Sequence, residues 1–101
     1  MNTSTFDTTA IQNNLRRITN QIYKLLPNRE EGLDWQKPLQ TLITELTGMS
    51  SLLPDQTELF SLLCKLKALQ EMTGEEDFML FRKTIFESLT LMDAIKLKCQ
   101  D

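Results

Sequence analysis

Glycine and proline divide this sequence of 101 residues into four segments, and each segment repeats apolar residues with the period of an α-helix. All three glycines and all three prolines lie at or beside the edges of these segments. Proline cannot continue a helix and glycine accepts positive φ, so both residues commonly mark helix ends. The predicted helices therefore span residues 9–26, 35–47, 56–72 and 75–98.

The apolar spacing within each segment favours helix over strand. Ile11, Leu15, Ile18, Ile22 and Leu25 follow one another at alternating intervals of four and three residues, which places them on one stripe of a helix. No alternation typical of a strand persists. Short connections favour antiparallel neighbours, so the sequence predicts an all-α fold, a compact antiparallel four-helix bundle. Its predicted core is Leu15, Ile18, Ile22, Leu42, Leu46, Leu62, Leu66, Phe81, Ile85, Leu89 and Met92.

Polar residues before the segments predict where the helices begin, because a side-chain oxygen can accept a hydrogen bond from a free backbone N–H at a helix start. Pro27 and Gly48 are predicted to end the first and second helices. The predicted caps are Thr9 with Gln12, Asp34, Asp55 with Glu58, and Thr73 with Glu76.

Composition indicates an ordinary globular chain, with 41% apolar residues, 25% charged residues and a net charge of −3. The longest apolar run, residues 78–81, is too short for a transmembrane span or a signal-peptide core. We expect a flexible polar N-terminus over residues 1–8, then a single helical-bundle domain over 9–101, in the cytoplasm. In that reducing compartment Cys64 and Cys99 are expected to be free thiols, buried or half-buried.

The residue types present do not favour a catalytic function. The chain has no histidine, which excludes histidine bases and most catalytic zinc sites, and two cysteines cannot supply four zinc ligands. The acidic cluster at residues 75–77 is interpreted as stabilising the positive end of the last helix. We therefore expect a protein that is not an enzyme, with no cofactor and no metal.

The last predicted helix carries more apolar residues than one buried stripe needs. Residues 75–98 would form a helix roughly 36 Å long, whereas residues 35–47 would span only about 20 Å. Met79, Phe86, Leu91 and Leu97 point away from its main stripe. Either the first and third helices cover these side chains, or they meet a second copy of the chain or another protein. The sequence therefore predicts a non-enzymatic protein–protein interaction module: a small subunit, adaptor or regulator.

The first helix supplies the alternative function. Arg16, Arg17 and Lys24 form the one local concentration of positive charge, in a chain that is otherwise acidic. They are either a solvated helix face or a weak contact to nucleic acid or an acidic partner, as in a small helical subunit of a nucleoprotein assembly. No small-molecule substrate is indicated, although the aromatic residues of the last helix leave a small-ligand carrier as a third hypothesis.

Overall fold

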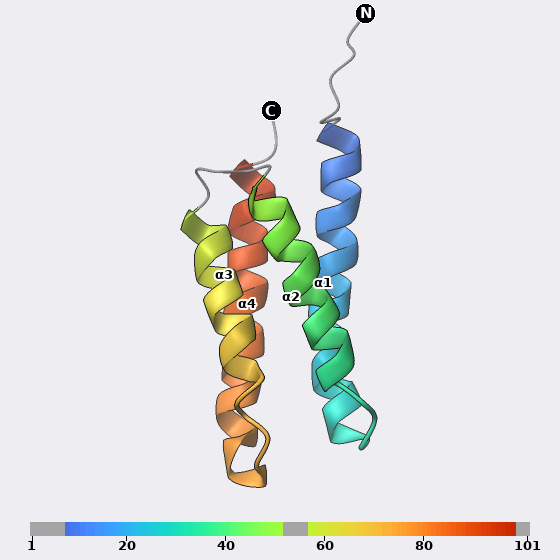
Figure 1. Ribbon diagram of the computed structural model, residues 1–101, viewed down its shortest axis with the longest axis vertical. Helices are drawn as coiled ribbons and strands as arrows, with labels where there is room; N and C mark the ends of the chain where they lie inside the picture. The colour runs from blue at the N-terminus through green and yellow to red at the C-terminus, as the bar shows by residue number, and fades with distance from the viewer. Residues whose placement is uncertain (1–7, 52–56, 99–101) are drawn as a thin grey trace, which may run out of the picture.

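A computed structural model of the chain describes residues 8–51 and 57–98, and within those ranges it contains helices joined by turns and short loops, with no strand (Figure 1). This confirms the all-α fold class. The elements in chain order are α1 (Thr8–Glu30), α2 (Gln36–Ser50), α3 (Thr57–Leu69), the short 3₁₀ helix η1 (Glu75–Asp77) and α4 (Phe78–Lys98). Outside the described part lie residues 1–7, the side chain of Thr9, Asp55 and Cys99. The predictions of a flexible N-terminus, of caps at Thr9 and Asp55 and of a free Cys99 thiol therefore fall outside it as well.

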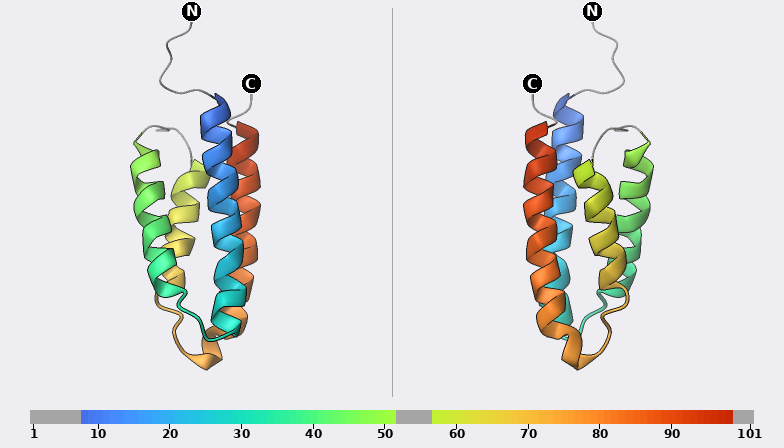
Figure 2. Two further views of the ribbon diagram at one scale, coloured as in Figure 1. Left: turned by 90° about the vertical axis from the view of Figure 1, so that its right-hand side faces the viewer. Right: turned by 90° about the vertical axis from the view of Figure 1, so that its left-hand side faces the viewer.

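The helices form a ring in which each packs against two neighbours. The order around the ring is α1, α2, α3, α4 and back to α1, as the two side views in Figure 2 also show. The two connections that the structure describes in full, residues 31–35 and 70–74, lie at the same end of the molecule, the lower end in Figure 1. This arrangement is consistent with a four-helix bundle.

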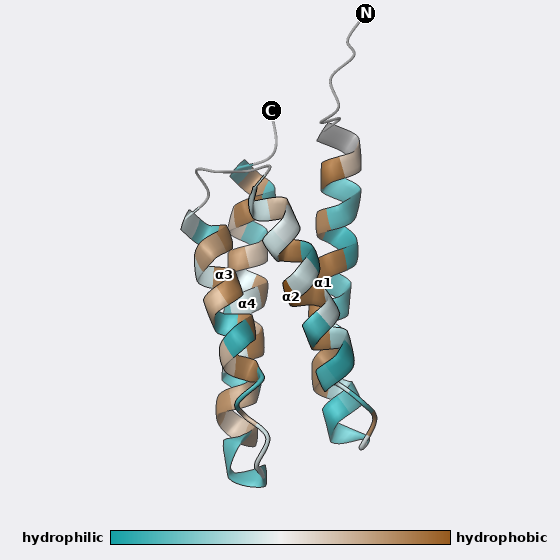
Figure 3. Cartoon of the chain, viewed as in Figure 1, coloured by the Kyte–Doolittle hydropathy of each residue, from teal (hydrophilic) through white to brown (hydrophobic). Residues whose placement is uncertain are grey.

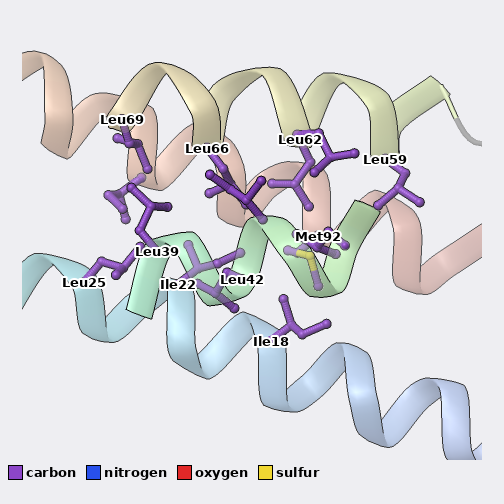
Figure 4. Close-up of a cluster of buried hydrophobic side chains, with 14 of the residues drawn as sticks. Ile18, Ile22, Leu25, Leu39, Leu42, Leu59, Leu62, Leu66, Leu69 and Met92 are labelled. Carbon is purple, nitrogen blue, oxygen red and sulfur yellow. The ribbon is translucent and has the colours of Figure 1, made fainter. Parts of the chain in front are cut away.

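Apolar residues of all four helices meet inside the ring. Figure 3 shows hydrophobic and hydrophilic residues alternating around each helix, and Figure 4 shows leucine, isoleucine and methionine side chains converging between the helices. The predicted core residues are buried, except Leu89, which is partly buried and packs against the others. The buried hydroxyl of Ser88 donates a 2.8 Å hydrogen bond to the Thr84 carbonyl, so α4 satisfies this polar group itself.

The prediction that Pro27 ends the first helix is wrong, because α1 continues to Glu30 with Pro27 inside it. Proline lacks an N–H but keeps its carbonyl, and the Pro27 carbonyl accepts a 3.0 Å hydrogen bond from the Glu31 N–H. The chain turns away from the helix axis just after this end, at Gly32, whose φ of 76° is the left-handed conformation that glycine adopts most easily.

The second helix begins as predicted and ends later. Its first free N–H groups, those of Gln36 and Lys37, donate to the Asp34 carboxylate at 3.0 and 3.3 Å, which confirms the capping role of Asp34. Gly48 was expected to end the helix in a left-handed conformation, but its φ is not positive and α2 continues to Ser50.

The third and fourth helices differ from prediction where they approach each other. The structure ends α3 at Leu69, and the next three residues form tighter turns in which each N–H donates to the carbonyl three residues earlier, at 3.0–3.2 Å. The predicted box of Thr73 and Glu76 does not form. Asp77 accepts a 3.2 Å hydrogen bond from the Gly74 N–H instead, and residues 75–77 adopt the 3₁₀ helix η1 before α4 begins.

The bundle core generates the first testable prediction. Leu66→Ala removes a fully buried side chain between the helices and should lower the free energy of unfolding by roughly 2–5 kcal/mol, because a cavity adds to the lost apolar burial. Urea unfolding measures this value. Phe60→Ala, on the outer side of α3, is the control and should change stability by less than about 0.5 kcal/mol. Equal effects of the two substitutions would contradict the assignment of the core.

Candidate functional site

The outward side of α4 carries a line of exposed residues that does not contribute to the core. Along it, positions follow one another at alternating intervals of four and three, so they lie on one stripe of the helix. Met79, Phe86 and Leu97 are its large apolar members, with 71%, 44% and 69% of their surface exposed. We call this line the outer stripe of α4; its residues, all exposed, are Met79, Lys83, Phe86, Thr90, Asp93 and Leu97.

Leu91 does not belong to this surface, although the sequence analysis grouped it with Met79, Phe86 and Leu97. The structure leaves Leu91 partly buried against the core. At 100° per residue, Leu91 lies roughly 120° around the helix from the outer stripe, which turns it toward a neighbouring helix. The structure thus brings together three of the four predicted interface residues.

A shallow hollow of about 650 Å³ lies at the η1 end of the outer stripe. Met79, Leu80 and Phe86 form its apolar part, and every lining residue comes from α4 itself. The guanidinium of Arg82 lies 5.2 Å from the centre of the Phe86 ring, a cation–π contact that covers one side of the ring. A hollow that a single helix lines cannot enclose a small ligand, so this surface suits a broad partner rather than a substrate.

Polar contacts lie on both flanks of α4, beside the core side chains that set its rotation within the bundle. On the α3 side, Lys65 pairs with Glu87 at 3.1 Å and Lys98 pairs with Glu58 at 2.7 Å. On the α1 side, the Gln12 amide donates a 3.3 Å hydrogen bond to the Lys96 carbonyl. The buried inner side of α4 turns its outer stripe away from the bundle, and the contacts on both flanks are consistent with this rotation.

The ion pair of Glu58 and Lys98 depends on pH. The hydrogen bond from Lys98 lowers the pKa of Glu58 below its ordinary value, because it favours the charged carboxylate. A lowered pKa in the folded state means that the contribution of the pair is present at neutral pH and is lost as the pH falls through that lowered pKa. At neutral pH the Glu58–Lys98 ion pair therefore stabilises the packing of α3 against α4.

The predicted basic face of the first helix is divided in the structure. Arg17 reaches across to α2, where its two terminal nitrogens donate to the Glu45 carboxylate at 2.6 and 3.3 Å, and Glu45 raises the pKa of Arg17. Arg16 and Lys24 are exposed and form no ion pair with another described residue. Because Glu45 neutralises Arg17, this surface has less positive charge for nucleic acid than the sequence indicated.

Arg29 is a structural centre that the sequence analysis missed. Its guanidinium donates to the carbonyl oxygens of Met72 and Gly74, the second at 2.8 Å. Its guanidinium carbon also lies 4.9 Å from the centre of the Trp35 ring and 4.5 Å from the centre of the Phe81 ring. One side chain therefore joins α1, the start of α2, the α3–η1 connection and α4.

Two aromatic side chains next to Arg29 pack against each other. Trp35 meets Phe81 edge to face, with ring centroids 4.9 Å apart and an interplanar angle of 73°. Arg29 was overlooked because the first helix was predicted to end before it. Arg29 lies two residues after Pro27, and nothing in the sequence around it indicates the carbonyl groups that its side chain binds.

Cys64 differs from expectation, because its thiol is free as predicted but its side chain is exposed rather than buried or half-buried. Position 64 faces outward on α3, on the same side as the exposed Phe60. In the ranges 8–51 and 57–98, no three acidic or cysteine side chains converge in a way that could hold a metal ion. No helix in those ranges combines the length and apolar character needed to cross a membrane.

Comparison with known proteins adds no family to these observations. No protein-family model, curated protein or solved structure matches the chain. Function is therefore argued from the described surface, on which the outer stripe of α4 aligns three exposed large apolar side chains.

The Arg29 cluster generates the second prediction. Arg29→Lys keeps the positive charge but loses the planar group that binds two carbonyls and stacks on rings, so stability should fall by about 1–3 kcal/mol. Urea unfolding measures the loss, and the emission of Trp35, the single tryptophan, should shift because its neighbour changes. Arg16→Lys, at an exposed position on the same helix, should leave both unchanged. A stable Arg29→Lys variant with wild-type emission would show that the cluster does not fix this end of the bundle.

Proposed function

We propose that this chain is a non-enzymatic protein–protein interaction module that binds its partner through the outer stripe of α4. The observation that carries the proposal is the alignment of Met79, Phe86 and Leu97 on the exposed side of a helix whose other side already fills the core. A helix that is apolar on two sides is typical of one that is covered on two sides. Among the described residues, the bundle covers the inner side of α4 and leaves the outer stripe exposed.

Burial of these side chains would provide most of the binding free energy. Moving one large apolar side chain from water to a packed interface contributes roughly 1.5–3 kcal/mol before the costs of association. Other exposed apolar side chains on the described surface lack this alignment. Phe60 on α3 is 69% exposed, but Cys64, Lys67 and Glu71 continue its line, so it is an isolated apolar residue of the ordinary kind.

The spacing of the outer stripe also defines the chemistry of the partner. Alternating intervals of four and three are those of a coiled-coil seam, which fits a second amphipathic helix lying along α4. That helix would place apolar residues against Met79, Phe86 and Leu97. It would also place an acidic residue near Lys83 and a basic residue near Asp93, because neither is paired with another described residue.

The proposal takes the scaffold to be an antiparallel four-helix bundle. Two connections of five residues each at one end of the molecule support this topology. In such a bundle the ends of α4 are held by the Arg29 cluster and by the Lys98–Glu58 pair, so the stripe is presented on a rigid element. We place the module in the cytoplasm, where the exposed Cys64 thiol would remain reduced.

Native size in cell extract tests the proposal, with the tagged protein expressed to well above micromolar concentration so that a weak complex stays assembled on the column. Tagged wild-type protein should elute from a sizing column as a species larger than the monomer. Phe86→Glu should return it to the monomer position, because a charge at the centre of the stripe opposes burial. Phe60→Glu is the matched control, an aromatic-to-acid change at an exposed site on another face, and should leave the large species intact. A wild-type monomer in extract, or equal loss in both variants, would contradict the proposal.

A further inference from the structure

We propose that the helix that binds the outer stripe is α4 of a second copy of this chain, in an antiparallel, two-fold symmetric pair. This inference rests on the proposed function, because it names the partner of the same surface. It follows from the order of residues along the stripe, which is complementary to itself when reversed.

The stripe is symmetric in position about Ser88. Met79 and Leu97 each lie nine residues from position 88, Lys83 and Asp93 each lie five residues away, and Phe86 and Thr90 each lie two residues away. When two copies of α4 cross antiparallel at this level, residues equally distant from Ser88 on opposite sides face each other. Each position of the stripe is thus opposed by another position of the same stripe.

The chemistry of these facing positions matches. Met79 faces Leu97 of the second copy, which buries two exposed apolar side chains together. Lys83 faces Asp93 of the second copy, which pairs opposite charges. Phe86 faces Thr90 of the second copy near the two-fold axis, where a large side chain meets a small one.

Charge selects this orientation over a parallel one. In a parallel pair each stripe residue would face its own copy, so Lys83 would meet Lys83 and Asp93 would meet Asp93. Like charges in contact disfavour association, and opposite charges fix orientation and register. The antiparallel pair replaces two repulsive contacts with two attractive contacts and retains the apolar ones.

The flanks of the stripe indicate that the pair is weak. Arg82 would approach Lys96 of the second copy, which brings together like charges, although Arg82 is drawn toward its own Phe86 ring at 5.2 Å. Glu87 would approach Glu87 of the second copy, but Lys65 of its own chain binds it at 3.1 Å. The stripe is about 27 Å long at 1.5 Å per residue. Such a narrow contact is smaller than the roughly 800 Å² per partner of a standard interface, so monomer and dimer should exchange at about micromolar concentrations.

Charge reversal tests the inference on purified full-length chain. Sedimentation equilibrium should show a dimer for the wild type, and Lys83→Glu and Asp93→Lys should each weaken it at least about tenfold, because each creates two like-charge contacts. The double variant Lys83→Glu/Asp93→Lys should dimerise again. An equimolar mixture of the two single variants should form a heterodimer, because one stripe then carries two acids and the other two bases.

Controls separate these effects from folding and from the proposed function. Both positions are exposed, so circular dichroism and melting should match wild type, and Lys67→Glu on the outer side of α3 should leave the dimer unchanged. A purified wild type that stays monomeric, or a mixture that does not pair, overturns the inference. If the larger species in cell extract still depends on Phe86, the proposed function survives with another protein as the partner; if that dependence is also absent, both fail.

Discussion

A helix in a ring of four touches two neighbours, so part of its circumference always faces outward. The residues on that outward part decide what each helix can bind outside the bundle. In α1, α2 and α3 the outward part carries mainly polar residues. Phe60 and Tyr23 are isolated exposed exceptions. In α4, the inward side contributes Phe81, Ile85 and Met92 to the core. Its outward side repeats apolar residues as well, and no helix within residues 8–51 and 57–98 covers them.

The two ends of α4 show how the bundle fixes the rotation of that helix. At one end, Arg29 binds carbonyl oxygens of the α3–η1 connection and stacks on the rings of Trp35 and Phe81. At the other end, Lys98 pairs with Glu58 of α3. A helix held at both ends keeps its outer stripe exposed as one continuous line, and its fixed backbone loses little entropy when a partner binds it.

The sequence predicted the core well and the helix ends poorly, and both outcomes have physical reasons. Apolar period is a local property, so the spacing of Leu15, Ile18 and Ile22 identified a buried stripe without knowledge of the neighbours. The end of α1 depends on distant groups, because the turn after Pro27 carries Arg29, whose carbonyl partners belong to a connection more than forty residues away. The Arg17–Glu45 pair was not predicted for the same reason, because it depends on the register of α1 against α2. Leu91 is a different case, because the helix period alone places it roughly 120° around α4 from Met79, Phe86 and Leu97.

Amide NMR spectra over a dilution series test most directly whether the outer stripe of α4 joins two copies of the chain. Exchange between monomer and dimer moves the amide signals nearest the contact. Concentration-dependent shifts are therefore expected along α4 from Met79 to Leu97, largest near the two-fold axis at Phe86 and Thr90. Spectra that do not change with concentration, or shifts centred on Phe60 or on Arg16 and Lys24, would contradict this dimer.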